Sequence, residues 1–319
     1  MSLKRTNFQR VFLLGAVLLV LMFSIFPFIQ ILSTSLKYQV DWGNPSLIPA
    51  QINLDAYKEL LGISTEEIEL PETIKIMLDS PAISEEQRAA IVKKFKSNAN
   101  VFPFGRYMLN TFVIATLTAL LSTAIATFAA YALSRLKFKG RSAFSNMVLF
   151  VYMVGGVLLM VPLYQMSVSV GLASSVTGTL ISLLLIYLVQ TLPVAIYMLG
   201  NYFRTIPFSL EEAAMIDGYS RTEAIFAIII PLSRPMLLTV MIYCFVIAWN
   251  EYLFASVFLK QYHDFHTLPL ALQTLFTSKN AIWDRIMAAS MLTLLPVIIA
   301  FTVANRFISS GGTEGGVKE

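Results

Sequence analysis

Six long runs of apolar residues recur along this chain and restrict its fold more than any other feature. Each run reaches the length of about 20 mostly apolar residues that a helix needs to cross a bilayer. In lipid the backbone must satisfy its own hydrogen bonds, which leaves helices or closed barrels, and barrel strands alternate over only about 10 residues. The sequence therefore predicts an all-α membrane protein with six transmembrane helices, at about residues 11–35, 108–134, 143–170, 177–202, 236–257 and 285–308.

The composition agrees with a membrane protein. Charged residues make up 13% of the 319 residues, and the mean hydropathy is +0.70. Ordinary soluble domains carry about 25% charged residues. The aromatic residues lie within the apolar runs rather than along a basic stripe, so no nucleic-acid partner is expected. The single cysteine, Cys244, allows no disulfide within the chain.

The distribution of basic residues predicts which links lie on which side of the membrane. The link after the second run carries Arg135, Lys137, Lys139 and Arg141, whereas residues 171–176 carry no charge. By the positive-inside rule the first link is cytoplasmic and the second is external. Because basic residues also precede the first run and the number of runs is even, both termini are expected in the cytoplasm.

A long polar insert separates the first two runs. The predicted organisation is a first helix with its N-terminus (residues 1–37), an external insert (38–106), a five-helix membrane core (107–308) that contains a charged loop (204–234), and a tail (309–319). The insert holds ten of the 19 acidic residues, and residues 84–95 have the pattern of a short amphipathic helix. Two interpretations of the insert stay open: it is a water-exposed loop without a binding role, or it is a surface that docks a partner.

The charged loop between the fourth and fifth runs predicts a helix–turn–helix outside the membrane. Ser209 and Glu212 fit a capping box, and so do Ser220 and Glu223. Gly218 lies where a left-handed residue ends the first helix, and Pro231 is expected to limit the second. Taken alone, this pattern is equally compatible with a simple connector.

The spacing within this loop resembles the EAA loop of ATP-binding-cassette importer permeases. That family has the pattern EAA-x3-G-x9-I-x-L-P, and the chain has Glu212, Ala213 and Ala214, then Gly218, Ile228 and Pro231, with Ile230 where leucine is usual. The loop also has the same place in the order of spans. The resemblance implies that this loop, including Glu211 and Asp217, meets a separate ATPase subunit, with Glu212 facing an arginine-bearing region of it.

The resemblance extends to permeases of the MalG type, which serve maltose and maltodextrin importers. The segments SLIPAQINLDAYKELLGIS (residues 46–64) and GGVK (315–318) carry it. It implies a MetI-like permease fold in a bacterial inner membrane, a MalF-like second permease, an ATPase dimer, an extracytoplasmic sugar-binding protein and surrounding lipid as partners. It also implies that the tail residues contact the ATPase and that the loop at about residues 259–284 faces the binding protein. The residues concerned are Gly315, Gly316, Val317 and Lys318 in the tail, and Tyr262, His263, His266, Thr277 and Asn280 in the loop.

Motifs for chemistry are missing from the sequence. No G-x-x-x-x-G-K-[ST] segment occurs, so ATP and Mg²⁺ are expected on a partner chain and no cofactor on this one. His263 and His266 lack a convincing third ligand, so no metal site is expected. With both histidines in one loop, no catalytic set can be assembled. The rival function is a self-sufficient secondary transporter, which would require ion-coupling groups in the membrane.

Glu251 is the one acidic residue that the sequence places within an apolar run away from the polar links. Two interpretations stay open for it. It reaches the outer interface beside Trp249, Asn250 and Tyr252, or it acts as a gate on a transport path.

Overall fold

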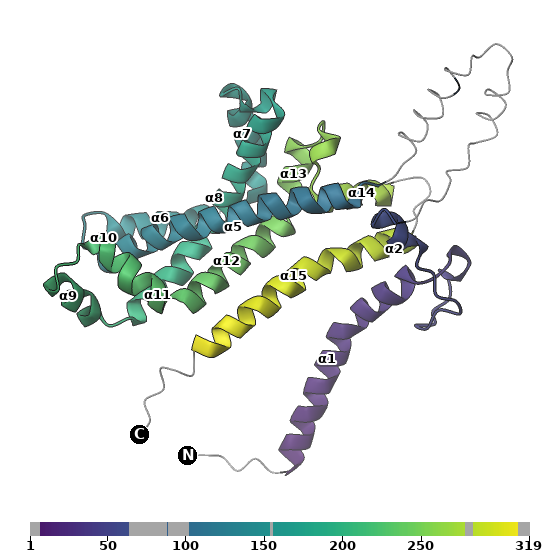
Figure 1. The fold of residues 1–319 in the computed structure, drawn as a ribbon, viewed down its shortest axis with the longest axis horizontal. Helices are drawn as coiled ribbons and strands as arrows, with labels where there is room; N and C mark the ends of the chain where they lie inside the picture. Colours follow the sequence, from purple (N-terminus) through teal and green to yellow (C-terminus); the bar gives the residue numbers. More distant parts are fainter. Residues whose placement is uncertain (1–6, 64–87, 89–101, 154–155, 278–282, 312–319) are drawn as a thin grey trace. The chain divides into compact units, whose positions relative to one another are not determined.

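The protein is all-helical in the part of the chain that the computed structural model describes, residues 7–63, 88, 102–153, 156–277 and 283–311 (Figure 1). Four helices are long and apolar enough to cross a membrane, and the number reaches six if each of two bent helix pairs is one span. These results confirm the predicted helical runs one, two, four and six. The four helices are α1 (Asn7–Ser35), α5 (Phe104–Arg135), α8 (Val176–Thr205) and α15 (Trp283–Gly311).

The third apolar run forms a bent pair of helices. It forms α6 (Arg141–Met153) and α7 (Gly156–Ser169), whose axes differ by 96°. Close packing at the start of α7 supplies a physical reason. A Cβ atom on Gly156 would lie 3.1 Å from Nε2 of Gln190 and 3.4 Å from the ring of Phe254. Glycine therefore allows α7 to begin directly against its neighbours, at the cost of helix propensity.

The fifth run is also interrupted. Helix α12 (Arg234–Trp249) ends before Asn250, and the short α13 (Leu253–Phe258) begins after Tyr252. A second bend lies before this run, because α12 turns by 82° from the preceding helical segment at residues 221–232.

The chain divides into two compact units, of which the first comprises residues 1–105 and 272–293. It contains α1, a 3₁₀ turn (Gln39–Asp41), α2 (Asp55–Leu60), most of α14 (Leu268–Thr277) and the start of α15. The first part of the insert is tied within this unit by a Ser35–Tyr57 hydrogen bond of 2.7 Å and an Arg285–Glu59 ion pair. Apart from Arg88, the helix predicted at residues 84–95 lies outside the described residues.

The second unit, residues 106–271 and 294–319, contains the main helical core. Small residues on α5 are almost fully buried and let neighbouring helices approach closely. Buried hydroxyl pairs link helices across this core, Ser122 to Thr191 between α5 and α8 and Ser167 to Ser182 between α7 and α8, each at 2.6 Å. The small residues on α5 are Ala115, Ala119, Ala126 and Ala130.

Candidate functional site

The charged loop forms a helical excursion between α8 and α12, which we call the α9–α11 segment (residues 208–232). It lies at one end of the second unit, beyond the ends of α5 and α8 (Figure 1). It consists of α9 (Phe208–Ile216), α10 (Arg221–Ala224), a π-helical turn (Ile225–Ile229) and α11 (Ile230–Leu232). The predicted helix–turn–helix is therefore present.

The first predicted capping box does not form. Helix α9 begins at Phe208, its N-cap is Pro207, and no side chain caps it. Ser209 consequently lies inside the first turn, where its hydroxyl is not placed as an N-cap acceptor. The reason is local, because Pro207 has a fixed φ near −57° and lacks an N–H, both of which suit the residue just before a helix.

The turn between α9 and α10 agrees with the prediction. Gly218 has a φ of +94°, in the left-handed region, and directly follows Asp217 at the C-cap of α9. The N–H of Tyr219 then donates to the carbonyl of Ala214 at 3.0 Å, which closes the end of the helix. The second capping box is confirmed, since Ser220 N donates to Glu223 at 2.7 Å and Glu223 N donates to Ser220 at 3.3 Å.

The second helix ends at Leu232, one residue after Pro231, which agrees with the predicted limit. The chain turns at the buried Ser233. A π-helical turn shortly before the proline allows the helix to include this residue. A proline inside an α-helix lacks an N–H and its ring presses on the preceding turn, and a wider π turn relieves both conflicts.

The two adjacent glutamates of α9 differ in burial. Glu212 and Ala213 are exposed, whereas Glu211 is only 3% exposed and Ala214 is buried. The resemblance implies that Glu211 belongs to the surface that faces a partner, whereas the structure turns its side chain inward. The other residues of the loop that were predicted to meet the ATPase also differ in exposure. Asp217 and Gly218 are exposed, while Ile228 and Pro231 are half-buried.

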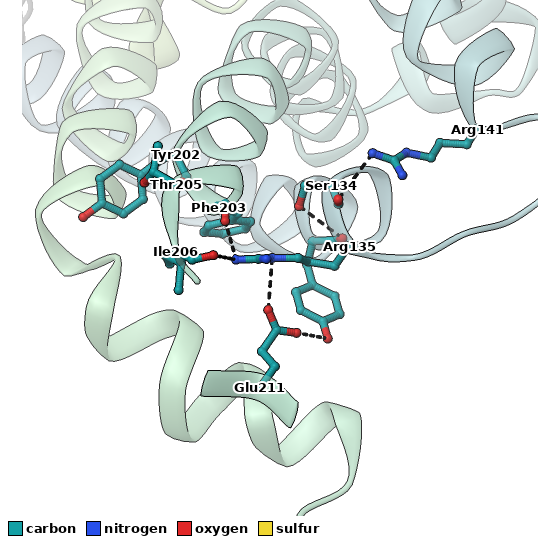
Figure 2. Close-up of polar contacts among 9 residues, drawn as sticks. Ser134, Arg135, Arg141, Tyr202, Phe203, Thr205, Ile206 and Glu211 are labelled. Carbon is teal, nitrogen blue, oxygen red and sulfur yellow. Dashed lines mark hydrogen bonds and ion pairs between the residues drawn. The ribbon is translucent and has the colours of Figure 1, made fainter. Parts of the chain in front are cut away.

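Arg135, at the end of α5, holds the buried Glu211 (Figure 2). Its Nε lies 3.0 Å from Oε1 of Glu211, and the hydroxyl of Tyr131 donates to Oε2 of the same carboxylate at 2.9 Å. Nη2 of Arg135 also donates to the carbonyls of Phe203 and, at 2.7 Å, Ile206, which lie at the end of α8. We call Arg135, Glu211 and Tyr131 the Arg135 cluster.

This role of Arg135 is not among the predictions from the sequence. The residue counted only as one of the charges that set topology, although it is the basic residue in the last turn of α5. A cation there interacts favourably with free carbonyls at a helix end, and that was the available signal.

Glu251 lies at the break between α12 and α13. Its carboxylate accepts hydrogen bonds from the N–H groups of Phe254 at 2.8 Å and Ala255 at 3.1 Å, and from the hydroxyl of Tyr187 at 2.7 Å. It therefore caps α13 and ties it to α8. This structural role was absent from both interpretations of the sequence.

The loop before α14 is fastened to the opposite end of α5 from Arg135. Arg106 pairs with Asp264, and the amide of Asn110 donates to the carbonyls of Asp264 at 2.9 Å and His266 at 3.1 Å. Thr111 accepts from the N–H of Leu268 at 2.6 Å. This fastening gives the loop a defined conformation on α5.

Among the residues predicted to face a binding protein, His263 is exposed, Tyr262 is half-buried and His266 is buried. Thr277 is the last residue of α14. Asn280 and the tail residues Gly315, Gly316, Val317 and Lys318 lie outside the described residues. Within the described residues no group of three or more His, Cys, Asp or Glu side chains is placed to hold a metal ion.

Acidification is expected to loosen this loop through His266. Burial lowers the pKa of His266 below its ordinary value of 6.5, the nearby His263 acts in the same direction, and the backbone of Lys260 and Leu259 opposes both. The ring also stacks on Tyr107 at 6.2 Å. As the pH falls below 6.5, the unfolded loop binds a proton before the folded loop does, so the folded loop loses stability that is fully present at higher pH.

We therefore expect amide hydrogen exchange in residues 259–268, corrected for the intrinsic rate, to show less protection at about pH 5.5 than at about pH 7.5. The His266→Phe variant keeps the stacking and should show no such difference. Equal protection of the parent protein at both pH values would contradict the assignment.

Comparison with known proteins adds independent findings. Residues 122–311 match the family model described as binding-protein-dependent transport system inner membrane component. The chain is 36% identical over 320 residues to the inner membrane ABC transporter permease protein YcjP of Escherichia coli, covering 100% of both chains. It is 30% identical to the maltose/maltodextrin transport system permease protein MalG of Escherichia coli, over 97% of this chain and 96% of the relative.

One further relative and one solved structure are also similar to this chain. The chain is 37% identical to the sulfoquinovosyl glycerol transport system permease protein SmoH of Agrobacterium fabrum, over 68% of this chain and 74% of the relative. A crystal structure of a bacterial ABC transporter involved in the import of the acidic polysaccharide alginate contains a similar chain. The TM-score is 0.70 at 22% identity, over 96% of this chain and 99% of that one.

Proposed function

The chain belongs to the family of binding-protein-dependent transport system inner membrane components, and on this premise we propose that it serves an ATP-driven carbohydrate importer. It is a permease component of an ABC transporter, with the all-helical MetI-like permease fold that the resemblance predicted. In the proposed importer it lines the translocation path with a second, MalF-like permease. A separate ATPase dimer binds ATP and Mg²⁺, so this chain carries no cofactor and no catalytic residue.

The observation that carries the proposal is the exposed face of the α9–α11 segment. Glu212 and Ala213 lie together on this face, and Ile216 beside them is 85% exposed. A small residue beside a carboxylate and an apolar side chain suits close docking into a cleft that offers a cation. We assign this face to the ATPase and place it, together with both termini and the tail residues 315–318, in the cytoplasm.

The loop at the opposite end of α5 supports the proposed contact with an external binding protein. The loop that Arg106 and Asn110 hold against α5 presents His263 to solvent. In the proposed importer, this loop and the residues that follow it, including Thr277 and Asn280, face an extracytoplasmic sugar-binding protein. Because His266 is buried, it supports the loop from within rather than touching this partner.

Maltose or a maltodextrin is the sugar we propose. The support is the MalG relative, which matches over almost the whole length of both chains. Another oligosaccharide is the alternative, because relatives of similar identity are named for different glycosides, such as sulfoquinovosyl glycerol for SmoH.

Reconstitution with its partners tests this function. The chain is purified in mild detergent with the ATPase, second permease and binding protein that accompany it, and the complex is inserted into liposomes. We expect maltodextrin with its binding protein to stimulate ATP hydrolysis and to be taken up in an ATP-dependent manner. A panel of other oligosaccharides identifies the substrate. Uptake that collapses with a protonophore while ATP is held constant would contradict the importer and favour a secondary transporter.

A further inference from the structure

We propose that Arg135 is a positioning residue that makes α9 move together with α5 and α8, so that movement imposed by the ATPase on α9 reaches the membrane helices through this side chain. The inference rests on the proposed function. It identifies the residue that passes the movement on, as distinct from the surface on which the ATPase acts.

The first argument is that Arg135 contacts three helices at once. It belongs to α5, it donates to carbonyls at the end of α8, and it pairs with Glu211 of α9 (Figure 2). The ring of Phe208, the first residue of α9, lies 5.8 Å from the guanidinium carbon and adds an aromatic contact. Displacing α9 alone would therefore break its contacts with α5, whose Arg135 is also hydrogen-bonded to the end of α8.

The chemistry of arginine suits this junction. A guanidinium is planar, always charged and presents five donors in a fixed geometry, so it can bind backbone carbonyls and a carboxylate together. A lysine ammonium is a compact point charge and cannot reproduce this arrangement. Here Nη2 donates to two carbonyls at the end of α8 while Nε forms the ion pair with Glu211 of α9, and a single ammonium group could not make these contacts from two separate nitrogen atoms.

Burial makes the junction strong. The side chains of Arg135 and Glu211 are only 7% and 4% exposed. Separating a buried pair leaves an uncompensated charge away from water, which is far more costly than opening an ion pair on the surface. The hydroxyl of Tyr131 occupies the other oxygen of Glu211, so both carboxylate oxygens are held.

The other end of α9 is connected differently. Its chain passes through the exposed turn at Gly218 into α10, and from there through the π turn and the 82° bend into α12. One polar link from α8 to α11 is the hydrogen bond of 3.2 Å from Tyr202 to the carbonyl of Leu232, which is exposed to solvent. Movement of α9 is therefore passed on more directly to α5 and α8 than to α12.

Adjacent glutamates of the same helix give a matched experiment. Glu211→Ala removes the buried partner of Arg135, and Glu212→Ala removes the exposed carboxylate. Each variant is assembled with its partners, and three quantities are measured: the ATPase retained on purification, the rate of ATP hydrolysis, and the sugar transported per ATP hydrolysed. A junction that only stabilised the fold would change the yield of complex but not the last ratio.

We expect Glu211→Ala to retain the ATPase while the sugar moved per ATP falls about tenfold or more, because a buried pair is broken. Glu212→Ala should instead retain less ATPase. Arg135→Ala should resemble Glu211→Ala, and the double variant should be no worse than either single one, because the two side chains act as a unit. If alanine variants fail to assemble, Glu211→Gln and Arg135→Lys, which keep the shape or the charge, are measured by the same ratio.

Three results would overturn the inference. They are an unchanged ratio of sugar to ATP in the assembled Glu211 variants, a loss of ATPase equal to that in Glu212→Ala, and additive losses in the double variant. Each of them leaves the proposed function standing if the parent complex shows sugar-stimulated ATP hydrolysis. A parent complex without such stimulation would contradict the proposed function itself.

Discussion

Replacing Gly218 with proline is expected to abolish ATP-driven transport while the protein still reaches the membrane. Proline fixes φ near −65°, whereas Gly218 has a φ of +94° and its N–H donates to the carbonyl of Met215 at 3.2 Å. The turn must therefore open, and α10 can no longer keep its place beside α9. We expect a loss of at least about tenfold in transport, since strained backbone positions of this kind are each worth about 1–3 kcal/mol.

Asparagine at the same position is the matched control. No atom lies within 4 Å of a Cβ built on Gly218, so crowding is not the obstacle and only the backbone conformation decides. Asparagine tolerates the left-handed region better than other residues with a side chain. Gly218→Asn should therefore keep most of the transport measured in proteoliposomes. Full activity of Gly218→Pro would show that the turn has no part in coupling.

Replacing Glu251 with alanine is expected to destabilise the protein strongly. The substitution removes the acceptor for the N–H groups of Phe254 and Ala255 and for the hydroxyl of the fully buried Tyr187. Loss of a helix cap together with a buried hydroxyl left without its partner costs about 3 kcal/mol. The midpoint of thermal unfolding in detergent should fall accordingly.

Tyr187→Phe provides the control for Glu251→Ala. It removes one of the donors and keeps the cap of α13, so the expected loss is smaller, about 1 kcal/mol. A gate role predicts a different pattern, in which Glu251→Ala changes the transport rate and leaves the unfolding midpoint unchanged. Measuring both quantities on both variants separates the two roles.

The helices could be predicted from the sequence, but their interruptions could not. Run length and hydropathy are properties of single segments, and they identified α1, α5, α8 and α15. The need for glycine at position 156 depends on how closely Gln190 and Phe254 approach, and that is a property of packing between helices. The π turn before Pro231 had no periodic signal in the sequence.

In the candidate site, too, local patterns could be predicted and contacts between distant residues could not. Gly218 and the capping box at Ser220 and Glu223 are local patterns, and both were predictable. The inward direction of Glu211 could not be read from its neighbours, since it depends on Arg135, which lies 76 residues earlier in the chain (211 − 135). Pairings over such distances in sequence are set by how the helices assemble.

The π-helical turn at Ile225–Ile229 has a consequence for the rotational phase of the chain. An α-helix turns by about 100° per residue, and a π turn accommodates one residue more than an α turn. The turn therefore absorbs one residue without rotating α11 against α10. Removing a single residue would convert it to an ordinary α turn, and Pro231 would lose the wider turn that precedes it. The spacing from Gly218 to Pro231 is on this view a constraint on residue count as much as on residue type.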